Sequence, residues 1–514
     1  MGQSMKIKLL VLDVDGTLTD GKIYYTSSGK EIKAFDIKDG LGIKEIAAAN
    51  GIQCAVITGR KSPMVERRCA DLNIAHLYQG VSDKTECLKS VLEKEGISFE
   101  ETAYMGVTDS TISHFQLTQP EGAFDRVIDG RGKLLMPALY NAHAHVPMTL
   151  LRGRGDNLPL DRWLNEAIFP FEAHIDAEAT YHATLLGIAE MLRFGVVSFT
   201  DMYFQTEARA RAVLDSGAKC NLSDCVVCSE PGMTYYDLPL AKENEQWIAQ
   251  YHGAGDGRLL IDMSLHAEYT STPEVVRTLA DATKAAGLRM QVHVSETQKE
   301  VQECIERHGK TPPVYLADLG LFDVPTTADH CVWLTDEDRS VLVEKGVFVA
   351  CCPASNAKLG SGIADIKAMK AAGITLTLGT DGVASNNNHN MFQDLYLLAL
   401  MQRAGDANPV SLSAEELVGI ATRNGALSQG RVDCGRMQVG ARADLTMLDI
   451  DTPWMQPVHT MAENLIYSAQ GSDVVLTMVD GTILYENGEY PTIDIEKEIA
   501  ETCAARERIL SEMA

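Results

Sequence analysis

Leu134-Leu-Met-Pro-Ala-Leu-Tyr-Asn-Ala-His143-Ala-His145 is an apolar run that ends in two histidines. We predict one strand that begins at Leu134 and closes with this pair. Residues two apart on a strand point to the same face, so both imidazoles can reach one metal ion, whereas on a helix they would diverge. The segment therefore predicts a buried strand that carries part of a metal site.

Further apolar strands follow this segment, and helices separate them. Thr272-Pro273 caps and opens a helix that runs to Ala286, Gly287 stops it, and Leu288–Val294 follows as a strand. Similar strands are predicted at Val196–Thr200, Leu259–Leu265, Val347–Cys351 and Ile374–Leu378. Repeated βα units over about 250 residues are typical of a (β/α)8 TIM barrel, whose reactive groups lie at the C-terminal ends of its strands.

Three more potential ligands end predicted strands of this α/β fold, namely His293, His330 and Asp381. Imidazoles with one carboxylate suit Zn²⁺ or Fe²⁺ and leave a coordination position for water. Such an ion would lower the pKa of that water to about 7. Glu296 follows His293 by three positions, beyond the strand end, and is the candidate proton shuttle.

These residues belong to longer motifs, which are Pro137-Ala-Leu-Tyr-Asn-Ala-His143-Ala-His145, His266-Ala-Glu-Tyr-Thr, His293-Val-Ser-Glu296-Thr, His330-Cys, Gly379-Thr-Asp381-Gly-Val-Ala-Ser-Asn-Asn and Gly440-Ala-Arg-Ala-Asp444. From about Phe124 to the C-terminus the chain resembles the amidohydrolase superfamily, and within it the methylthioadenosine/S-adenosylhomocysteine deaminases. The resemblance implies hydrolytic deamination of the adenine ring of a nucleoside, with an inosine-type product and ammonia.

The resemblance also implies residue roles. The metal, zinc or iron, would be held by His143, His145, His293 and Asp381. The catalytic groups would be Glu296, which protonates N1 of the ring, with His330 and Asp381, which orient the nucleophile that attacks C6. Substrate contacts would come from Glu172, which accepts hydrogen bonds from the ribose hydroxyls, and from His266.

One departure bears on the substrate. Members of the group that this chain resembles carry an arginine after the third strand, which grips the amino-acid end of S-adenosylhomocysteine, whereas this chain has Asn221-Leu-Ser-Asp-Cys225. A carboxylate would lack its bidentate partner. We therefore expect methylthioadenosine, 5'-deoxyadenosine or adenosine to be preferred. A chlorohydrolase or a guanine deaminase remains open, because the metal ligands are shared.

The N-terminal part has a chemistry of its own. Apolar strands are predicted at Lys8–Asp13 and Cys54–Thr58, with a helix over Leu41–Asn50 between them, which indicates a parallel sheet. Asp13 and Asp15 lie at the end of the first strand. Two carboxylates on one face suit an aspartyl nucleophile beside a general acid, with Mg²⁺ between them and a phosphate.

From Met5 to about Gly106 the chain resembles haloacid-dehalogenase-type phosphatases, specifically the 3-deoxy-manno-octulosonate 8-phosphate phosphatase group. The motifs are Asp13-Val-Asp15-Gly-Thr17-Leu-Thr-Asp-Gly, Ile57-Thr58-Gly59-Arg60 and Gly80-Val-Ser-Asp-Lys84. The resemblance implies that Asp13 attacks phosphorus, that Asp15 protonates the leaving group, and that Thr58 and Lys84 hold the phosphoryl oxygens.

The resemblance to these phosphatases ends before their metal site is complete. The phosphatases follow their fourth strand with Gly-Asp-Asp, whereas this chain has Gly106-Val-Thr-Asp109, so Mg²⁺ would lose a ligand at Val107. The alternative function is a Rossmann-like phosphatase domain that acts on 3-deoxy-manno-octulosonate 8-phosphate or a similar sugar phosphate. Two further alternatives are a scaffold role for this module and a folded but inactive protein.

The predicted domain order follows from these likenesses. Residues 1–109 form a truncated phosphatase-like domain, 110–133 a junction with residual β-strands, 134–422 the barrel, and 423–514 a small flanking β-sandwich with a terminal helix. The deaminase-like part would also lack the first strands of its small domain. The chain thus resembles a join between two incomplete proteins.

Composition restricts partners and compartment. The 514 residues are 45% hydrophobic and 23% charged, as in a globular protein, and the net charge is −26. Such a charge disfavours nucleic acids and anionic membranes as partners. The partner that the deaminase resemblance implies is a small nucleoside, and self-association stays possible. The twelve cysteines are widely spread, which favours a reducing cytoplasm.

Overall fold

The computed structural model describes residues 9–22, 24–28, 31–50, 52–82, 84, 87–88, 91, 103–406 and 412–514. The chain forms two compact units. One contains Met1–Met105 with Gln116–Glu121, and the other contains Gly106–Phe115 with Gly122–Ala514. Residues 5–8 of the phosphatase-like segment, and Asp83 of its last motif, lie outside the described residues.

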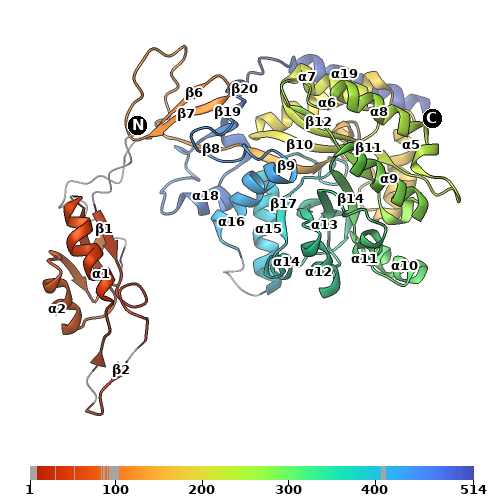
Figure 1. The fold of residues 1–514 in the computed structure, drawn as a ribbon. Coiled ribbons are helices and arrows are strands. Elements are labelled where there is room, and N and C mark those ends of the chain that lie inside the picture. Colours follow the sequence, from red (N-terminus) through yellow and green to blue (C-terminus); the bar gives the residue numbers. More distant parts are fainter. Residues whose placement is uncertain are drawn as a thin grey trace. The chain divides into compact units, whose positions relative to one another are not determined.

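The first unit contains a three-stranded parallel sheet, which confirms the parallel arrangement predicted there (Figure 1). The strand order is β1 (Leu9–Leu12), β4 (Gln53–Thr58), β5 (His76–Gln79). The predicted helix starts four residues early, because Asp36 accepts a hydrogen bond from the Lys38 amide and caps it there. The other elements are β2 (Tyr24–Tyr25), β3 (Glu31–Ile32), α1 (Ile37–Leu41), η1 (Gly42–Ala47) and α2 (Pro63–Asp71).

The second unit is built on a parallel sheet that curves into a barrel (Figure 1). It has eight strands when two short segments separated by Asp262 are counted as one. In spatial order they are β17 (Thr375–Leu378), β16 (Phe348–Cys351), β15 (Thr326–His330), β14 (Met290–Val294), β13 (Met263–Leu265) with β12 (Leu259–Ile261), β11 (Lys219–Val226), β10 (Val196–Tyr203) and β9 (Leu139–Ala144). The TIM-barrel prediction is therefore confirmed.

Helices alternate with these strands and pack outside the barrel (Figure 1). The predicted helix, α9 (Pro273–Ala286), has the expected ends, because Thr272 accepts from the Val275 amide and Gly287 adopts φ +67°. The other helical segments are η2 (Val146–Leu151), α4 (Leu160–Arg162), η3 (Trp163–Ile168), α5 (Phe169–Glu172), α6 (Ala177–Arg193), α7 (Thr206–Ser216), η4 (Tyr235–Asp237), α8 (Pro239–Tyr251), η5 (Glu268–Thr270), α10 (Gln298–His308), α11 (Pro312–Asp318), α12 (Asp336–Glu344), α13 (Pro353–Leu359), α14 (Ile366–Ala372), α15 (Met391–Asp406), α16 (Ala414–Gly419), η6 (Ile420–Asn424), α17 (Gly425–Ser428), α18 (Met461–Tyr467), η7 (Gly471–Asp473) and α19 (Ile495–Glu512).

The two end strands of the barrel sheet, β9 and β17, approach each other. The contact is made by the residues that follow β17. The Asp381 amide donates to the His143 carbonyl at 3.0 Å, and the Thr380 amide donates to Asn141 Oδ1 at 3.0 Å. Gly379 permits this approach, because a Cβ atom there would come within 2.8 Å of the His143 Cβ. These contacts bring Asp381 beside the histidine pair.

The prediction of a single strand from Leu134 to His145 is wrong. It is two strands, β8 (Lys133–Pro137) and β9, and only the second belongs to the barrel. Pro137 has no amide hydrogen, and the chain changes partners at the next residue. The Ala138 amide donates to the Asp444 carbonyl, next to the flanking sheet, whereas the Leu139 amide donates to the Gly195 carbonyl, next to β10 of the barrel. His145 lies just beyond β9.

The flanking β-region is a four-stranded antiparallel sheet with the order β20 (Thr482–Glu486), β19 (Val474–Val479), β18 (Leu445–Asp449), β8. A hairpin of β6 (Tyr104–Thr108) and β7 (Thr111–Gln116) adds to this region. The Ile112 amide donates to Ala441 at 2.9 Å and the Gly440 amide to Ile112 at 2.8 Å. Because of this pairing, Val107 and Asp109 belong to the barrel unit and not to the phosphatase-like unit in which they were predicted.

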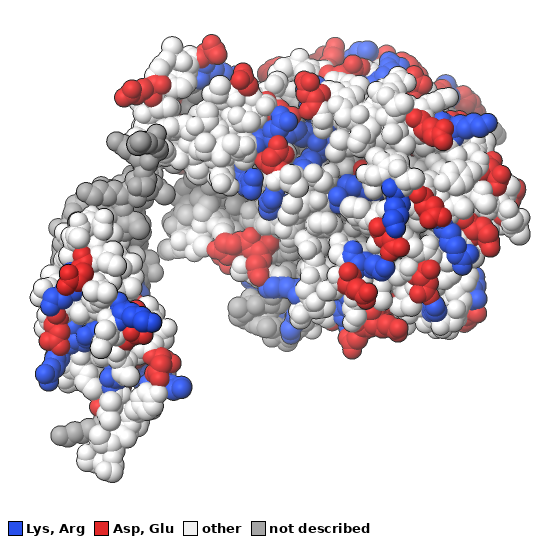
Figure 2. Space-filling view, in the orientation of Figure 1, with Lys and Arg blue, Asp and Glu red and all other residues white. Residues whose placement is uncertain are grey.

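None of the helices that the structure describes is long and apolar enough to cross a membrane. On the face shown in Figure 2, acidic and basic side chains are interspersed over the second unit.

Candidate active site

A buried cluster of histidines lies at the C-terminal ends of the barrel strands. The ligand atoms of His143, His145 and His293 lie within 4.8 Å of one another, and the same holds for His143, His330 and Asp381. His143, His293 and His330 belong to strands β9, β14 and β15, whereas His145 and Asp381 follow strand ends. The structure thus brings together all five groups, and the cluster can hold a metal ion.

The distances within the cluster suit a cation. His145 Nε2 lies 3.2 Å from Asp381 Oδ1 and 3.3 Å from His293 Nε2, and His143 Nε2 lies 3.5 Å from the same carboxylate oxygen. Nitrogen lone pairs and a carboxylate that converge in this way are the donor set of a zinc-type site.

Backbone carbonyls orient two of the imidazoles. His145 Nδ1 donates to the Met202 carbonyl at 2.5 Å, and His293 Nδ1 donates to the His266 carbonyl at 2.6 Å. Because the Nδ1 proton is used in this way, the Nε2 lone pair of each ring is free to face the cluster. Burial, together with the neighbouring imidazoles, lowers the pKa of His293 well below its usual value, so this ring is a neutral ligand.

Asp329 contacts the third imidazole and was missed in the sequence. Its Oδ2 lies 3.1 Å from His143 Nδ1, and both side chains are fully buried. Burial lowers the pKa of His143, but Asp329 and Asp381 outweigh that effect and raise this pKa to about 10. The one available signal was its place directly before His330, because a carboxylate in a buried strand needs a partner.

Asp381 is held by hydrogen bonds to both oxygens. Ser355 Oγ donates to Oδ2 at 2.5 Å, Ser385 Oγ donates to the same oxygen at 2.8 Å, and the Gly382 amide donates to Oδ1 at 2.7 Å. Burial raises the pKa of Asp381, but bonds from His143 and His145 hold it well below the usual value. The carboxylate is therefore ionised.

The residues at these strand ends have unusual backbone conformations. His330 has φ +67° and Asp381 has φ +61°, in the left-handed region that is costly for residues with a side chain. Such conformations persist where the surrounding structure enforces them, and they occur often at active sites.

Glu296 lies beside His330, as the two predicted roles require. Its Oε2 is 3.9 Å from His330 Nε2. Glu300, a residue that the sequence analysis missed, holds the turn in place, because its carboxylate accepts from the amides of Ser295 and Glu296 at 2.8 and 2.7 Å. The spacing Thr297-x-x-Glu300 is a capping-box signature that could have identified it. Burial, with the charge of Glu296, raises the pKa of Glu300 to about 8.

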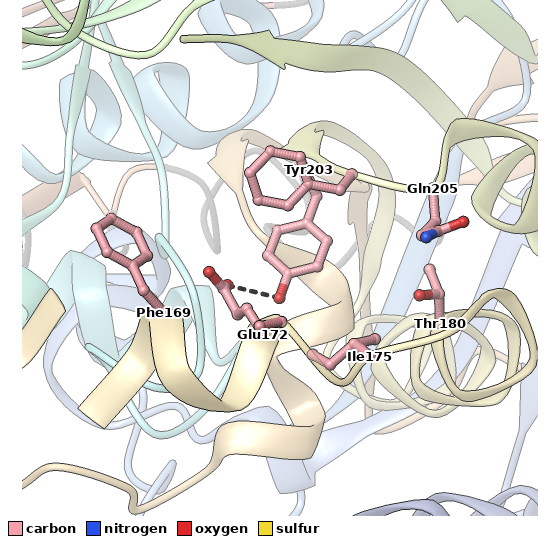
Figure 3. A pocket seen from close by; sticks show the side chains of 8 residues that line it. Phe169, Glu172, Ile175, Thr180, Tyr203 and Gln205 are labelled. Atoms are coloured by element: carbon pink, nitrogen blue, oxygen red, sulfur yellow. Dashed lines mark hydrogen bonds between the residues drawn. The ribbon is translucent and has the colours of Figure 1, made fainter. Parts of the chain in front are cut away.

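Glu172 lines a cavity of about 390 Å³, shown in Figure 3. Tyr203 OH donates to Glu172 Oε1 at 2.6 Å, and Tyr203 directly follows Met202, whose carbonyl binds His145. Burial raises the pKa of Glu172. The described lining contains no Lys, Arg or His and consists of Phe169, Glu172, Ala173, Ile175, Thr180, Tyr203, Phe204 and Gln205.

His266 lies next to the cluster, and its ring centroid is 5.0 Å from that of His293. Burial first, and then the charges of His145 and His143, lower the pKa of His266 to about 4. A neutral ring at this place can donate or accept a hydrogen bond.

The first unit brings together three of its four predicted groups. Lys84 Nζ lies 2.6 Å from Asp13 Oδ2, and Thr58 is buried at the end of β4, where it hydrogen-bonds to Asp13. Burial raises the pKa of Asp13, but bonds from Lys84 and the Val14 amide lower it overall. Asp15 pairs instead with Lys33, a residue that the sequence analysis did not single out.

The barrel, the flanking sheet and the histidine cluster define a class of protein. Residues 134–484 match the amidohydrolase family, and the chain belongs to this family. It is 39% identical over 402 residues to a 5'-deoxyadenosine deaminase of Methanothermobacter thermautotrophicus, an alignment that covers 78% of this chain and 93% of the relative. It is also 39% identical to a 5-methylthioadenosine/S-adenosylhomocysteine deaminase of Dictyoglomus thermophilum, over 73% of this chain and 87% of the relative.

Solved structures agree with this assignment. An adenosine deaminase from Xanthomonas campestris with bound zinc superposes with a TM-score of 0.75 at 29% identity, over 82% of this chain and 96% of that one. An atrazine chlorohydrolase from Arthrobacter aurescens complexed with zinc has a TM-score of 0.74 at 26% identity, over 79% and 96% of the two chains.

Proposed function

We propose that this protein is a metal-dependent hydrolase that deaminates adenine nucleosides and releases ammonia and an inosine-type product. The observation that carries the proposal is the convergence of five metal-binding or acid–base groups in one buried cluster, with Glu296 beside it. The deaminase names of the relatives support both the reaction and the class of substrate.

The metal would be held by His143, His145, His293 and Asp381. Three neutral imidazoles with one ionised carboxylate fit Zn²⁺ and also accept Fe²⁺, so His143 would give up its extra proton when the ion binds. The zinc in related structures favours Zn²⁺. When bound, the ion supplies a water molecule that is acidic enough to act as hydroxide at neutral pH.

The side chains of this protein handle the protons and the substrate. Glu296 would donate a proton to N1 of the adenine ring, which makes C6 electrophilic, while His330 and Asp381 would orient the attacking oxygen. The proton of that oxygen would pass through Asp381 to the 6-amino group, which would then leave as ammonia. The ionised form of Glu172 would accept hydrogen bonds from the two ribose hydroxyls. His266, as a neutral ring, would contact the base.

A neutral 5' group is the preferred one in this proposal. Asn221–Cys225 offers no arginine, and the described lining of the cavity beside Glu172 has no cation to pair with an amino-acid carboxylate. The kcat/KM values should therefore be higher for methylthioadenosine, 5'-deoxyadenosine and adenosine than for S-adenosylhomocysteine. The reverse order would contradict this preference.

The test combines metal analysis with ammonia release from methylthioadenosine. Glu296→Gln should keep its metal and lower kcat by about 10²–10⁴-fold, the usual contribution of a general acid. The matched control is Glu303→Gln, an exposed acid on α10, which should retain normal activity. A Glu296→Gln protein with the normal rate would refute the proposed mechanism.

The pairing of Lys84 with Asp13 supports a second candidate function. The first unit would then be a haloacid-dehalogenase-type module that binds Mg²⁺ and hydrolyses a sugar phosphate such as 3-deoxy-manno-octulosonate 8-phosphate. Phosphate release from p-nitrophenyl phosphate with Mg²⁺ should occur and should disappear in Asp13→Asn. A scaffold role predicts no release from either protein.

The cysteines support a reducing compartment. Nine of the described cysteines are buried as free thiols in the structure. We propose a cytoplasmic location on this basis.

A further inference from the structure

One short segment contacts both groups to which we assign proton transfer. Ser361 Oγ donates to Glu296 Oε1 at 3.1 Å, and Asn356 Oδ1 accepts from His330 Nδ1 at 2.8 Å. Ser361 and Asn356 are 4% and 3% exposed, so water does not compete for these bonds.

The segment is fixed in place by its own backbone. The Ser361 amide donates to the Asn356 carbonyl at 2.9 Å, and Trp333 Nε1 donates to the Ser361 carbonyl at 2.7 Å. The Trp333 amide in turn donates to the Ser295 carbonyl at 3.0 Å. The turn that carries Ser361 is therefore tied to the residue directly before Glu296.

Two glycines allow the chain to pass here. Gly360 has φ +71° and Gly362 has φ +126°, conformations that side chains rarely permit. A Cβ at Gly362 would also come within 3.0 Å of Val332 and 3.1 Å of Trp333. Ser361 is thus placed against the strand end that carries His330.

A serine hydroxyl suits a carboxyl group that gains and loses a proton. It donates to the carboxylate and can accept from the carboxylic acid, so the contact persists in both states. With Oε1 engaged by Ser361, Oε2 is the oxygen that faces His330 Nε2 and is left to exchange a proton.

We propose that Ser361 is a positioning residue of the reaction, which holds Glu296 in the orientation that delivers its proton to the substrate ring. This inference rests on the proposed function, because it assumes that Glu296 is the proton donor. Asn356 orients His330 from the same segment.

The test is a double-mutant cycle in the full-length, metal-loaded protein with methylthioadenosine as substrate. Ser361→Ala should lower kcat by about 10-fold and leave KM within about two-fold, because the lost bond orients a catalytic group and does not touch the substrate. Ser361→Thr keeps the hydroxyl and should retain most of the activity.

The second arm of the cycle separates positioning from a structural effect. In a Glu296→Gln background, Ser361→Ala should cause no further loss, because the group through which it acts is already removed. The matched control is Ser216→Ala, a buried serine at the end of α7, on the opposite end of the barrel, whose hydroxyl donates to the Val213 carbonyl. Its kcat should remain normal, although Ser216 Oγ also accepts from the Ala218 amide and its loss should lower Tm at least as much as Ser361→Ala does. Metal content should be equal in all variants.

Three outcomes are distinguishable. Normal activity in Ser361→Ala, with activity lost in Glu296→Gln, overturns this inference alone. An equal loss in both backgrounds also overturns it, since the effect would not pass through Glu296. Normal activity in Glu296→Gln overturns the proposed function itself.

Discussion

His143 illustrates how neighbouring charges prepare a ligand at the scale of a single residue. Its two ring nitrogens face Asp329 at 3.1 Å and Asp381 at 3.5 Å. A carboxylate on the far side of a ligating imidazole fixes its orientation and increases its basicity. We therefore expect Asp329 to influence a bound metal ion through His143.

Asp329→Asn should weaken metal binding by about 10–100-fold, the usual effect of removing such a partner. Competition with a chromophoric zinc chelator measures this affinity directly. Asp323→Asn, at an exposed acid paired with Lys345, is the matched control and should bind zinc normally. Equal affinities in the two variants would show that Asp329 has no influence on the metal.

Glu172→Gln should raise KM by about 10-fold and change kcat little, because a charged acceptor of ribose hydrogen bonds is lost. Burial raises the pKa of Glu172, so in the unmodified protein KM should increase as the pH falls through that raised pKa and the carboxylate is protonated. In Glu172→Gln, this increase of KM at low pH should be absent. Glu166→Gln, an exposed acid paired with Arg162, serves as the control; a normal KM in Glu172→Gln would exclude the role.

At the scale of secondary-structure elements, the site depends on how closely β9 and the end of β17 approach. Gly379 is the residue that permits this contact, since an added Cβ would lie 2.8 Å from the His143 Cβ and 3.1 Å from its backbone nitrogen. Backbone atoms cannot move aside as a flexible side chain can. The separation of these two strand ends sets the distance between His143 and Asp381.

Gly379→Ala should therefore lower both Tm and bound zinc per chain, because the two strand ends must move apart. Overpacking of this kind costs about 1–3 kcal/mol. Gly419→Ala is a suitable control, because it lies in α16 with no atom within 4 Å of the added Cβ and should be neutral or slightly stabilising. Full zinc occupancy and an unchanged Tm in Gly379→Ala would contradict the expectation.

At the scale of the whole molecule, the chain passes from the first unit to the second between Met105 and Gly106, and Gln116–Glu121 belong again to the first unit. Residues after this point pair with the flanking sheet of the barrel, through bonds such as that of the Ala443 amide to the Ser110 carbonyl at 2.9 Å. The barrel unit thus contains its own cluster, its cavity and the β6–β7 turn.

A fragment Gly106–Ala514 should keep deaminase activity, with kcat/KM within about two-fold of the full chain, since a compact unit with its own core can fold alone. A fragment Gly122–Ala514 is the comparison. It lacks the hairpin, so the Gly440 amide, the Ala441 carbonyl and the Ala443 amide lose their partners, and its Tm should be lower. An inactive longer fragment would mean that the first unit is required for the reaction.

The sequence alone was enough to predict the barrel and the membership of the main cluster. Buried parallel strands are continuous apolar runs, so β14, β16 and β17 were predicted to within two residues of their observed ends. Ligands at such ends converge in any closed barrel, which is why His143, His293 and Asp381 could be grouped without coordinates. The caps of α9 are local interactions and were equally visible.

Only the tertiary structure determined the partners of these residues. The contacts of Asp329, Glu300 and Ser361 join different segments or close a left-handed turn. The sequence does not specify the distances between the atoms in these contacts. The change of sheet at Ala138 and the pairing of Ile112 with Ala441 likewise depend on which backbone groups meet in the folded chain. Periodicity and local propensity define elements, whereas long-range hydrogen bonding and packing decide which elements become neighbours.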